Sequence, residues 1–231
     1  TRQAGEAGVD VFHSPHYNFP FGLRMPGVAT VHDLIPLRFP KQFGPAKRLY
    51  ARTMIGHACK SARLIISGSH HAKADLVNEF GIDENRVRVI YHGVPSEFGV
   101  VAPREVESFR ARYDLTRPYA FFASNFKPHK NLPLLLRAFA AVPATPLPNL
   151  VLVGGDRARH ADLRRLVADL KIEDRVKLPG KLSQADLVRA YHAARMVVFP
   201  SLYEGFGFPA LEAMACGTPL VASNASSLPE V

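Results

Sequence analysis

Two glutamates flank a glycine-rich loop near the end of the chain. Glu204 and Glu212 stand on either side of Gly-Phe-Gly-Phe, within the stretch PSLYEGFGFPALEAMACGTPLVAS at 200–223. Glycines let backbone amides turn toward a ligand, and the positive end of a helix starting near Pro209 favours a phosphate. Carboxylates accept hydrogen bonds from sugar hydroxyls. The spacing favours a ligand with a diphosphate between two polyol parts, although a tight turn beside a glutamate that complements the helix dipole gives the same pattern.

A second group of candidate ligands follows a predicted strand in ASNFKPHKNLPLLL at 123–136. Lys127, His129 and Lys130 cluster there, and Asn131 is placed to cap the next helix. A lysine beside a helix N-terminus is a natural phosphate ligand. Loop charges that only face solvent would look the same, so the residues alone leave both interpretations open.

His32 and Asp33 are a third candidate, directly after the strand predicted in ATVHDLIPLRFP at 29–40. Such a pair could orient a substrate hydroxyl or carry a proton. A structural hydrogen bond is the alternative interpretation of the same two residues.

The histidines and cysteines give no metal-binding pattern. His13-x-x-His16 and His70-His71 are the tight histidine clusters in the sequence, and neither has the HExxH pattern or cysteine partners. The sequence also contains no Asp-x-Asp pair, which often holds a divalent ion on a nucleotide diphosphate. We therefore predict a site without metal, in which Lys130 and the amides of residues 205–207 carry the charge of a diphosphate.

These candidates follow strands in an alternating order of strands and helices. Hydrophobic or β-branched runs begin near residues 27, 62, 86, 119, 149, 175 and 195, and helical patterns separate them. In HADLRRLVADL, for example, the apolar residues share one helical face: Leu163, Leu166, Val167 and Leu170. Strands that are hydrophobic throughout and alternate with amphipathic helices are typical of parallel sheets covered on both faces. The predicted fold class is α/β.

A charged stretch with three prolines, 95–118, divides the strands into two groups and is typical of a linker with a short helix. We predict an N-terminal domain at 1–98, a linker at 99–117 and a C-terminal domain at 118–231. Ligands of open α/β sheets bind beyond the carboxyl ends of the strands, so two such domains are expected to face each other across a cleft.

The charge balance limits the choice of partners. The 231 residues include 29 Lys and Arg against 20 Asp and Glu, a formal net charge of +9. This excess favours anionic partners, although many basic proteins have none. No zinc-knuckle spacing or aromatic RNA-binding motif is present, so nucleic acid is not predicted. A basic segment could face an anionic membrane or form a solvated helix face; its residues are Lys47, Arg48, Arg52, Lys60 and Arg63.

Taken together, the ordered motifs resemble those of GT-B glycosyltransferases of family 4, a retaining class that uses nucleotide-diphosphate sugars. EGFGFPALE is similar to the E-x7-E motif of that family, flanked by VFPSLY and EAMACGTPLVASNASSLPEV. Five further segments match in the family's order: VHDL, RVRVIYHGV, FKPHKN, LVLVGG and RVKLPGKLSQADLVRAYHAA. The resemblance covers nearly the whole chain and implies two Rossmann-like domains. Within the family, it is similar to bacterial mannosyl- and rhamnosyltransferases that assemble O-antigen and other surface polysaccharides.

The resemblance implies a role for each matching residue. Glu204 would contact the donor sugar, Lys130 would neutralise the diphosphate leaving group, and His32 would reach across the cleft to the transferred sugar. The donor would be held by loop amides at the diphosphate, by a glutamate at the ribose and by backbone at the base. The residues implied are Asn125, Lys127, Gly180, Lys181, Leu182, Gly205, Phe206, Gly207 and Glu212. A phosphate oxygen would take the acceptor's proton, so the resemblance implies neither metal nor cofactor.

The chain departs from the family pattern in two ways. The family often has an arginine soon after the glycine of the first strand–helix loop of the donor domain, where this chain reads Ser-Asn-Phe-Lys at 124–127. Lys127 is the expected substitute. The chain also starts near the middle of a typical first domain and stops at Val231, so we expect both domains to be truncated.

The implied activity is transfer of a hexose to a glycan or lipid-linked glycan acceptor, with retention, in cell-surface polysaccharide synthesis. Mannose from GDP-mannose is the preferred donor. Three alternatives stay open: a GT-B sugar-nucleotide epimerase, a transferase with a UDP-sugar donor, and a non-catalytic nucleotide-sugar-binding fragment. Two distant cysteines fit a reducing compartment, and no apolar run approaches the roughly 20 residues of a membrane span. We expect a cytoplasmic protein, with peripheral contact at the inner face of the plasma membrane.

Overall fold

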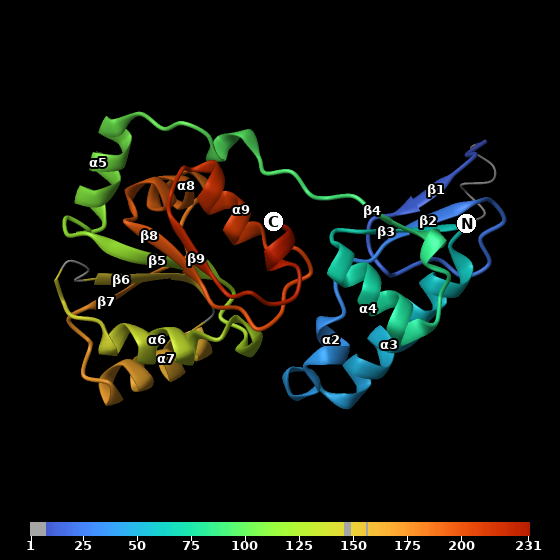
Figure 1. Cartoon of the computed structure of the whole chain (residues 1–231), viewed down its shortest axis with the longest axis horizontal. Coiled ribbons are helices and arrows are strands. Elements are labelled where there is room, and N and C mark those ends of the chain that lie inside the picture. The colour runs from blue at the N-terminus through green and yellow to red at the C-terminus, as the bar shows by residue number, and fades with distance from the viewer. Residues whose placement is uncertain (1–7, 146–148, 156) are drawn as a thin grey trace. The chain divides into compact units, whose positions relative to one another are not determined.

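The structure is a computed structural model that describes residues 8–145, 149–155 and 157–231. The chain forms two compact units (Figure 1). The N-terminal unit consists of Thr1–His92, Tyr203–Phe206 and Ser226–Val231, and the C-terminal unit consists of Gly93–Leu202 and Gly207–Ala225. These units are defined by packing, whereas the bounds 1–98, 99–117 and 118–231 follow the order of the chain and stay a prediction.

The N-terminal unit is built on a four-stranded parallel sheet with the order β1-β2-β3-β4. The strands are β1 (Phe12–Ser14), β2 (Gly27–Thr30), β3 (Leu64–Ser67) and β4 (Val87–Val89). The connections contain α2 (Ile35–Arg38), η1 (Pro40–Gln42), α3 (Pro45–Ser61), α4 (His70–Phe80) and η2 (Glu84–Arg86). Because parallel strands end at the same edge of a sheet, the loops after β2 and β3 start side by side.

Helix α4 shows how local sequence and distant residues fix one element. Ser69 caps its start, with its hydroxyl accepting a hydrogen bond from Ala72 N, and Gly81 ends it in the left-handed conformation. The two carboxylate oxygens of Glu230 accept hydrogen bonds from the amides of His70 and His71, each at 2.7 Å. A carboxylate from the end of the chain therefore completes the cap of a helix in its first half.

Helices α3 and α4 bury their apolar faces against this sheet. Ile55 of α3, Leu76 of α4 and Ile65 of β3 are fully excluded from solvent and belong to one core cluster. Burial of each such side chain stabilises the folded protein by about 1.5–3 kcal/mol. This packing stabilises the helices more than their intrinsic helix propensity does.

The C-terminal unit is built on a five-stranded parallel sheet with the order β7-β6-β5-β8-β9. The strands are β5 (Tyr119–Ser124), β6 (Asn149–Gly154), β7 (Val176–Gly180), β8 (Met196–Phe199) and β9 (Leu220–Ala222). The α-helices are α5 (Pro103–Arg112), α6 (Leu132–Ala141), α7 (Arg157–Asp169), α8 (Gln184–Ala193) and α9 (Phe208–Ala215). The 3-10 turns are η3 (Ser96–Phe98) and η4 (Pro128–Lys130), and η5 (Leu228–Glu230) belongs to the N-terminal unit.

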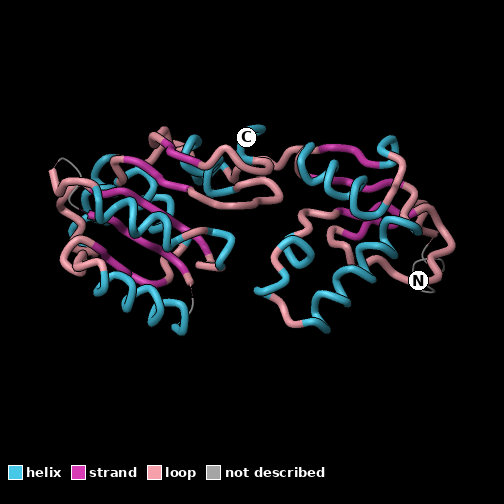
Figure 2. The backbone as a smooth tube through the Cα atoms, turned by 60° about the horizontal axis from the view of Figure 1, so that its bottom comes forward, coloured by secondary structure: helices cyan, strands magenta, loops and turns pink. Residues whose placement is uncertain are grey.

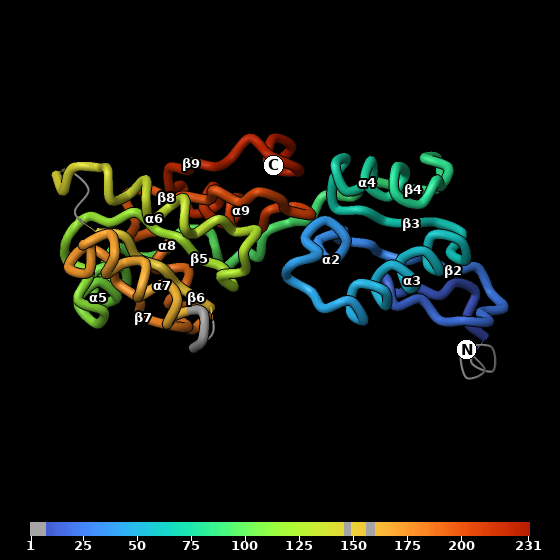
Figure 3. The backbone as a smooth tube through the Cα atoms, turned by 90° about the horizontal axis from the view of Figure 1, so that it is seen from below, coloured from blue at the N-terminus to red at the C-terminus, as the bar shows by residue number. Residues whose placement is uncertain are grey.

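The helices of the C-terminal unit divide between the two faces of its sheet. Helices α6 and α7 cover one face, and α5, α8 and α9 lie on the other (Figures 1 and 3). Figure 2 shows the parallel strands of this sheet between the two helical layers. Tyr119 and Phe121 of β5 and Tyr191 of α8 are fully buried between sheet and helices. The predicted α/β class with parallel sheets is confirmed.

The predicted linker contains the short helix expected there, as α5. This helix packs on α8 and buries Phe109 in the core of the C-terminal unit, together with Leu115. An apolar face on α5 explains this packing, because Val106 and Phe109 recur three residues apart. Across the described residues, no helix is both long enough and apolar enough to cross a membrane.

Candidate active site

The loop Tyr203–Phe206 lies against the carboxyl edge of the N-terminal unit's sheet. Gly205 approaches the loop after β2 so closely that a Cβ added to it would lie 2.2 Å from His32 O and 2.8 Å from Asp33 Cβ. Its carbonyl oxygen accepts a hydrogen bond of 2.7 Å from Ser69 Oγ, which follows β3. Glycine is therefore required at this position by close approach, and not by an unusual φ.

The backbone of Glu204 is held by two serines near the end of the chain. Its N–H donates to Ser226 Oγ at 2.8 Å, and its carbonyl accepts from Ser227 Oγ at 3.1 Å. The residue is 6% exposed. Because the backbone of Glu204 is held in place and the residue is buried, its carboxylate can reach a ligand from few positions.

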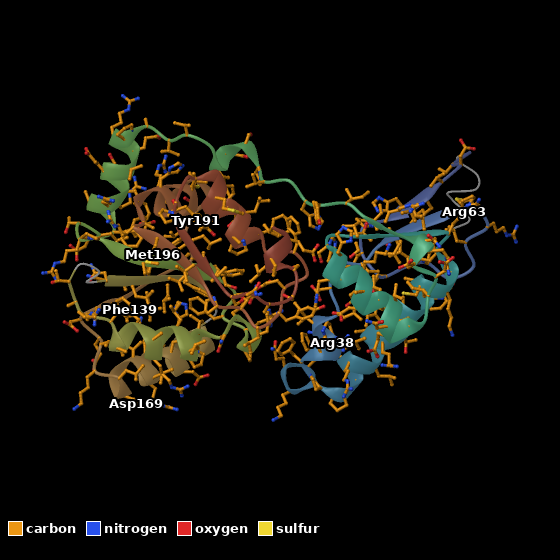
Figure 4. The ribbon with its side chains drawn as sticks, in the orientation of Figure 1. Arg38, Arg63, Phe139, Asp169, Tyr191 and Met196 are labelled. Carbon is orange, nitrogen blue, oxygen red and sulfur yellow. The ribbon has the colours of Figure 1, made fainter. Side chains whose placement is uncertain are left out.

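Tyr203 anchors the other end of this loop in a buried polar network. Its hydroxyl donates to Asp75 Oδ2 at 2.6 Å, and Asp75 Oδ1 accepts from Arg38 at 2.5 Å. Burial, and then the bond to the Asp75 carboxylate, raise the pKa of Tyr203 well above its ordinary value. Arg38 is labelled at the end of α2 in Figure 4. The network joins α2, α4 and the loop, and its three side chains satisfy one another's hydrogen bonds.

His32 lies at the exposed edge of the same unit. Its Nε2 is 3.0 Å from Pro15 O, and its ring centroid is 5.5 Å from that of His92. The His92 ring in turn lies 5.0 Å from the ring of Phe206 in an edge-on contact. Burial lowers the pKa of His92, and the neighbouring His32 lowers it further. Asp33 accepts a hydrogen bond from Ile35 N at 2.8 Å, which is a structural bond of the kind considered for this pair.

A pocket of about 290 Å³ opens at the carboxyl ends of β5, β6 and β7 in the C-terminal unit. It is lined by Ala123, Ser124, Val153, Gly154, Lys181, Leu182, Leu187 and Glu212. Glu212 Oε2 accepts a hydrogen bond of 2.6 Å from Tyr191 Oη, and Figure 4 labels Tyr191 on α8. The tyrosine fixes one carboxylate oxygen, so the other can accept hydrogen bonds from a molecule in the pocket.

The ionisation of Glu212 couples this pocket to stability. Burial raises the pKa of Glu212 above its ordinary value of 4.5, and the bond from Tyr191 opposes part of that rise. A raised pKa means that the folded protein favours the protonated carboxyl, so stability is lost as the pH rises above 4.5 through the raised value.

We expect Glu212→Gln to raise the unfolding midpoint at pH 7, because glutamine keeps an acceptor for Tyr191 without the buried charge. The difference from the wild type should shrink as the pH falls toward 4.5. Thermal unfolding of both proteins between pH 4 and pH 8 measures this, with Glu107→Gln, an exposed carboxylate of α5, as the matched control. A variant less stable than the wild type at pH 7 would contradict the expectation.

The lysines predicted after β5 differ in their surroundings. Lys130 is 8% exposed, and its Nζ lies 5.3 Å from the centroid of the Phe199 ring at the end of β8. Lys127 is half-buried and lines a separate cavity of about 240 Å³ between η4, α6 and α7. Asn125 is exposed, and its Oδ1 accepts from Lys127 N at 3.3 Å. The structure therefore does not place Lys127 in the pocket that contains Glu212.

Asn131 occupies the expected N-cap position of α6, but the expected hydrogen bond from its side chain is not formed. Its φ of 57° puts it in the left-handed region, whereas capping side chains belong to an extended N-cap residue. Its carbonyl oxygen instead accepts bonds from Leu134 N and Leu135 N.

The remaining predicted residues are backbone positions at element ends. Gly180 ends β7 with a φ of 85°, ahead of Lys181 and Leu182 in the pocket wall. Gly207 has a φ of 114° at the start of α9, a conformation that favours glycine. In the N-terminal unit, His32 and Phe206 both contact the His92 ring, and Gly205 lies directly against the backbone of His32. In the C-terminal unit, Glu212 lines the same pocket as Lys181 and Leu182.

Several residues at these sites were not predicted. Gly154 lines the pocket, and a Cβ there would lie 2.0 Å from Ser124 O; the double glycine in LVLVGG was an available signal for such close approach. No local sequence pattern reveals the hydrogen-bond partners of Tyr191, Ser69 or the serines at 226–227. Within the described part of the chain, no group of three His, Cys, Asp or Glu side chains could hold a metal ion.

Comparison with known families decides the relationship of the chain. Residues 103–231 match the family described as glycosyl transferases group 1, and residues 1–98 match the one described as Glycosyltransferase Family 4. The chain belongs to the group 1 glycosyl transferases. The predicted family membership is therefore confirmed.

This group 1 chain is similar in sequence to bacterial enzymes. It is 31% identical over 224 residues to O-antigen chain mannosyltransferase B of Escherichia coli, a match that covers 96% of this chain and 58% of that protein. It is 35% identical over 173 residues to D-inositol 3-phosphate glycosyltransferase of Mycolicibacterium smegmatis, covering 72% of this chain and 38% of that one. The chain spans little more than half the length of the first of these relatives.

Solved structures confirm the GT-B fold of this group 1 chain. Anabaena Alr3699/HepE in complex with UDP-glucose has a TM-score of 0.82 at 24% identity, over 99% of this chain and 63% of that one. WaaG, a glycosyltransferase involved in lipopolysaccharide biosynthesis, has a TM-score of 0.76 at 18% identity, over 99% and 64%. At such identities these matches bear on the fold alone.

Proposed function

We propose that the protein transfers a hexose from a nucleotide-diphosphate sugar to a glycan or lipid-linked glycan in cell-surface polysaccharide synthesis. The observation that carries this proposal is the pocket at the ends of β5, β6 and β7, in which Tyr191 holds one oxygen of Glu212 at 2.6 Å. Ligands of parallel α/β sheets bind at this edge, and a fixed carboxylate is a good acceptor for the vicinal hydroxyls of a ribose.

We assign the following roles at the donor to residues of the C-terminal unit. The backbone of residues 180–182 would line the nucleotide base beside Glu212. Lys130, a buried cation, would neutralise the diphosphate as it leaves, which is where negative charge develops. Asn125 and Lys127 would assist at the diphosphate, with Lys127 in place of the family's arginine.

Four further residues would act at the transferred sugar or beside it. Glu204 would accept hydrogen bonds from the sugar hydroxyls, and the amides of Phe206 and Gly207 would bind the sugar and the diphosphate. His32, exposed at the sheet edge, would contact the sugar at the reacting end. We propose retention, with a donor phosphate oxygen accepting the proton of the attacking hydroxyl and with no metal or cofactor.

Mannose from GDP-mannose is the proposed donor, in line with the mannosyltransferases among the relatives. The likeness to a UDP-glucose-binding structure, at 24% identity, makes UDP-glucose the comparison donor. The acceptor is proposed as a growing glycan, because O-antigen chain enzymes are among the relatives.

The deciding experiment is thermal unfolding of the protein with GDP, UDP or ADP, with and without magnesium. A ligand that binds the folded form alone and is present at about 100 times its dissociation constant stabilises by about 2.7 kcal/mol. We expect GDP to raise the midpoint without magnesium. Incubation with GDP-mannose or UDP-glucose, followed by analysis of the product's anomeric configuration, then tests transfer and retention.

The outcomes separate the alternatives. A rise in the midpoint without turnover of any donor would identify a nucleotide-sugar-binding protein without catalysis. Conversion of the free sugar nucleotide, with no acceptor consumed, would identify an epimerase. No rise with any nucleotide in a cooperatively unfolding sample would refute the proposed donor site.

We also propose that the start of α3 contacts an anionic membrane surface. Lys47 and Arg48 are exposed there, beside Leu49 and Tyr50, whose exposed fractions are 67% and 52%. No acidic residue occurs between Asp33 and Asp75 in the sequence. Arg52, further along α3, is paired with Glu79. Exposed apolar side chains beside exposed cations, as at residues 47–50, suit the interface of an anionic bilayer.

Reversing two of these charges, in Lys47→Glu with Arg48→Glu, is expected to weaken binding to phosphatidylglycerol vesicles by at least about 30-fold, since each cation contributes about 1 kcal/mol. Co-sedimentation with anionic and neutral vesicles measures it. Arg164→Glu with Arg165→Glu, on exposed positions of α7, is the control with the same change in net charge. Equal loss in both double variants, or wild-type binding insensitive to salt, would remove the idea.

A further inference from the structure

Three consecutive carbonyl groups of the loop Tyr203–Phe206 accept hydrogen bonds from serine hydroxyls. Ser69 Oγ donates to Gly205 O at 2.7 Å. Ser227 Oγ lies 3.1 Å from Glu204 O and 2.8 Å from Phe206 O, so its single proton is shared between them, with the shorter contact to Phe206. The oxygens of the peptide groups 204–205, 205–206 and 206–207 are thereby each directed at a serine.

Both serines are rigidly placed. Ser69 and Ser227 are fully buried, and Ser69 is also fixed as the cap of α4 because its oxygen accepts from Ala72 N. Ser226, the neighbour of Ser227, has a φ of 53°, a conformation that costs a non-glycine residue free energy. In that conformation its Oγ accepts the N–H of Glu204 at 2.8 Å. Local strain at Ser226 is therefore balanced by a bond to this loop.

Because a peptide group is planar, each of these bonds to a carbonyl oxygen also fixes the direction of the N–H group in the same peptide. In a trans peptide the N–H points away from the C=O of the same unit. Binding of Gly205 O by Ser69 aims the Phe206 N–H away from Ser69, and binding of Phe206 O by Ser227 aims the Gly207 N–H away from Ser227. Rotation of either peptide would break a buried hydrogen bond and leave its carbonyl group unsatisfied.

Close packing blocks the alternative of moving the whole loop. Gly205 already touches the loop after β2, where an added Cβ would lie 2.2 Å from His32 O. Tyr203 is tied to Asp75 at 2.6 Å on the preceding side. The loop can therefore neither shift toward the sheet nor pull away from α4 without breaking a contact.

We infer that Ser69 and Ser227 are positioning residues that hold the Phe206 and Gly207 amides in the direction needed to bind phosphate oxygens of the donor. This inference rests on the proposed function and extends it to residues that touch no substrate. Fixed backbone amides stabilise an anion more than mobile ones because no reorganisation is needed when the charge arrives.

The test compares ligands that differ in their phosphates. Affinities for GDP, UDP and ADP, and for guanosine, uridine and adenosine, are measured by isothermal titration on the wild type, Ser69→Ala and Ser227→Ala. Each variant is expected to bind the preferred nucleoside diphosphate at least about 10-fold more weakly, the effect of one hydrogen bond to a charged group. Binding of the corresponding nucleoside should change by less than about 2-fold.

Two further variants separate position from stability. Ser69→Thr keeps a hydroxyl that can both cap α4 and donate to Gly205 O, so it should restore diphosphate binding. Ser201→Ala is the matched control, because Ser201 is a fully buried serine whose hydroxyl has no hydrogen-bond partner in the described structure. If Ser227→Ala does not fold, Ser227→Cys replaces it with a side chain of similar shape and weaker donor strength.

Equal losses for diphosphate and nucleoside would overturn the inference, since they would indicate general damage to the protein. Diphosphate binding unchanged in folded variants would overturn it as well. A wild type that binds neither ligand would refute the proposed function itself, and this inference with it.

Discussion

Gly205→Ala is expected to abolish the proposed glycosyl transfer and to destabilise the protein by about 1–3 kcal/mol, the usual cost of forcing a methyl group into packed space. The added Cβ would meet His32 O at 2.2 Å and Asp33 Cβ at 2.8 Å, both part of the loop after β2 and neither the end of a flexible side chain. The loop must therefore retreat and give up the bond from Ser69. Donor turnover and chemical denaturation measure the two effects.

The matched control is Gly44→Ala. Gly44 also lies in the N-terminal unit, but a Cβ there would meet no atom within 4 Å. Its φ of −61° suits alanine, so stability and turnover should stay near the wild-type values. If Gly205→Ala turns over the donor at the wild-type rate, the close approach of the two loops has no bearing on catalysis.

Lys130→Met is expected to lower kcat about 100- to 1000-fold while the protein remains folded. Removing one group that stabilises developing charge typically has this effect, and Lys130 is proposed to face the diphosphate as it departs. Methionine preserves the length of the side chain and its contact with the Phe199 ring, from which the lysine Nζ is 5.3 Å distant. Steady-state kinetics with saturating donor measure the change.

Lys177→Met provides the comparison, since it removes the same charge from the same unit. Lys177 forms an ion pair of 3.0 Å with Asp114, whose side chain is 82% exposed, and such pairs contribute little. We expect this variant to retain wild-type kcat. A Lys130→Met protein with unchanged kcat would instead mean that Lys130 has a packing role against β8.

Most of the fold could be predicted because its strands and helices have strong local patterns. The run HADLRRLVADL was predicted as a helix and, apart from its last residue, falls in α7 (Arg157–Asp169), and the hydrophobic run that begins near residue 119 contains β5 (Tyr119–Ser124). Strands β1 and β9 were not predicted. Each has only three residues and gains its stability from pairing with β2 or β8, so the local sequence carries little signal.

Residues of the candidate site could be predicted only where they belong to a local sequence motif. Glu212 stands at the expected edge of a sheet, in the pocket wall with Lys181. Its partner Tyr191 lies 21 residues away, and Ser69 lies 136 residues from Gly205. Such pairs arise from tertiary packing and leave no spacing to recognise. Asn131 failed as a cap for a local reason, because its backbone is left-handed.

The bond from Glu230 to α4 has a consequence for the order of folding. Glu230 lies 160 residues beyond His70. Closing a loop of that length costs about 2.4 kcal/mol more than closing one of ten residues, so this cap forms after other contacts have brought the segments together. At the usual speed of synthesis, about 5–20 residues per second, Glu230 is synthesised about 8 to 30 seconds after His70. The sheet of the N-terminal unit is therefore synthesised long before one of the residues that completes its packing.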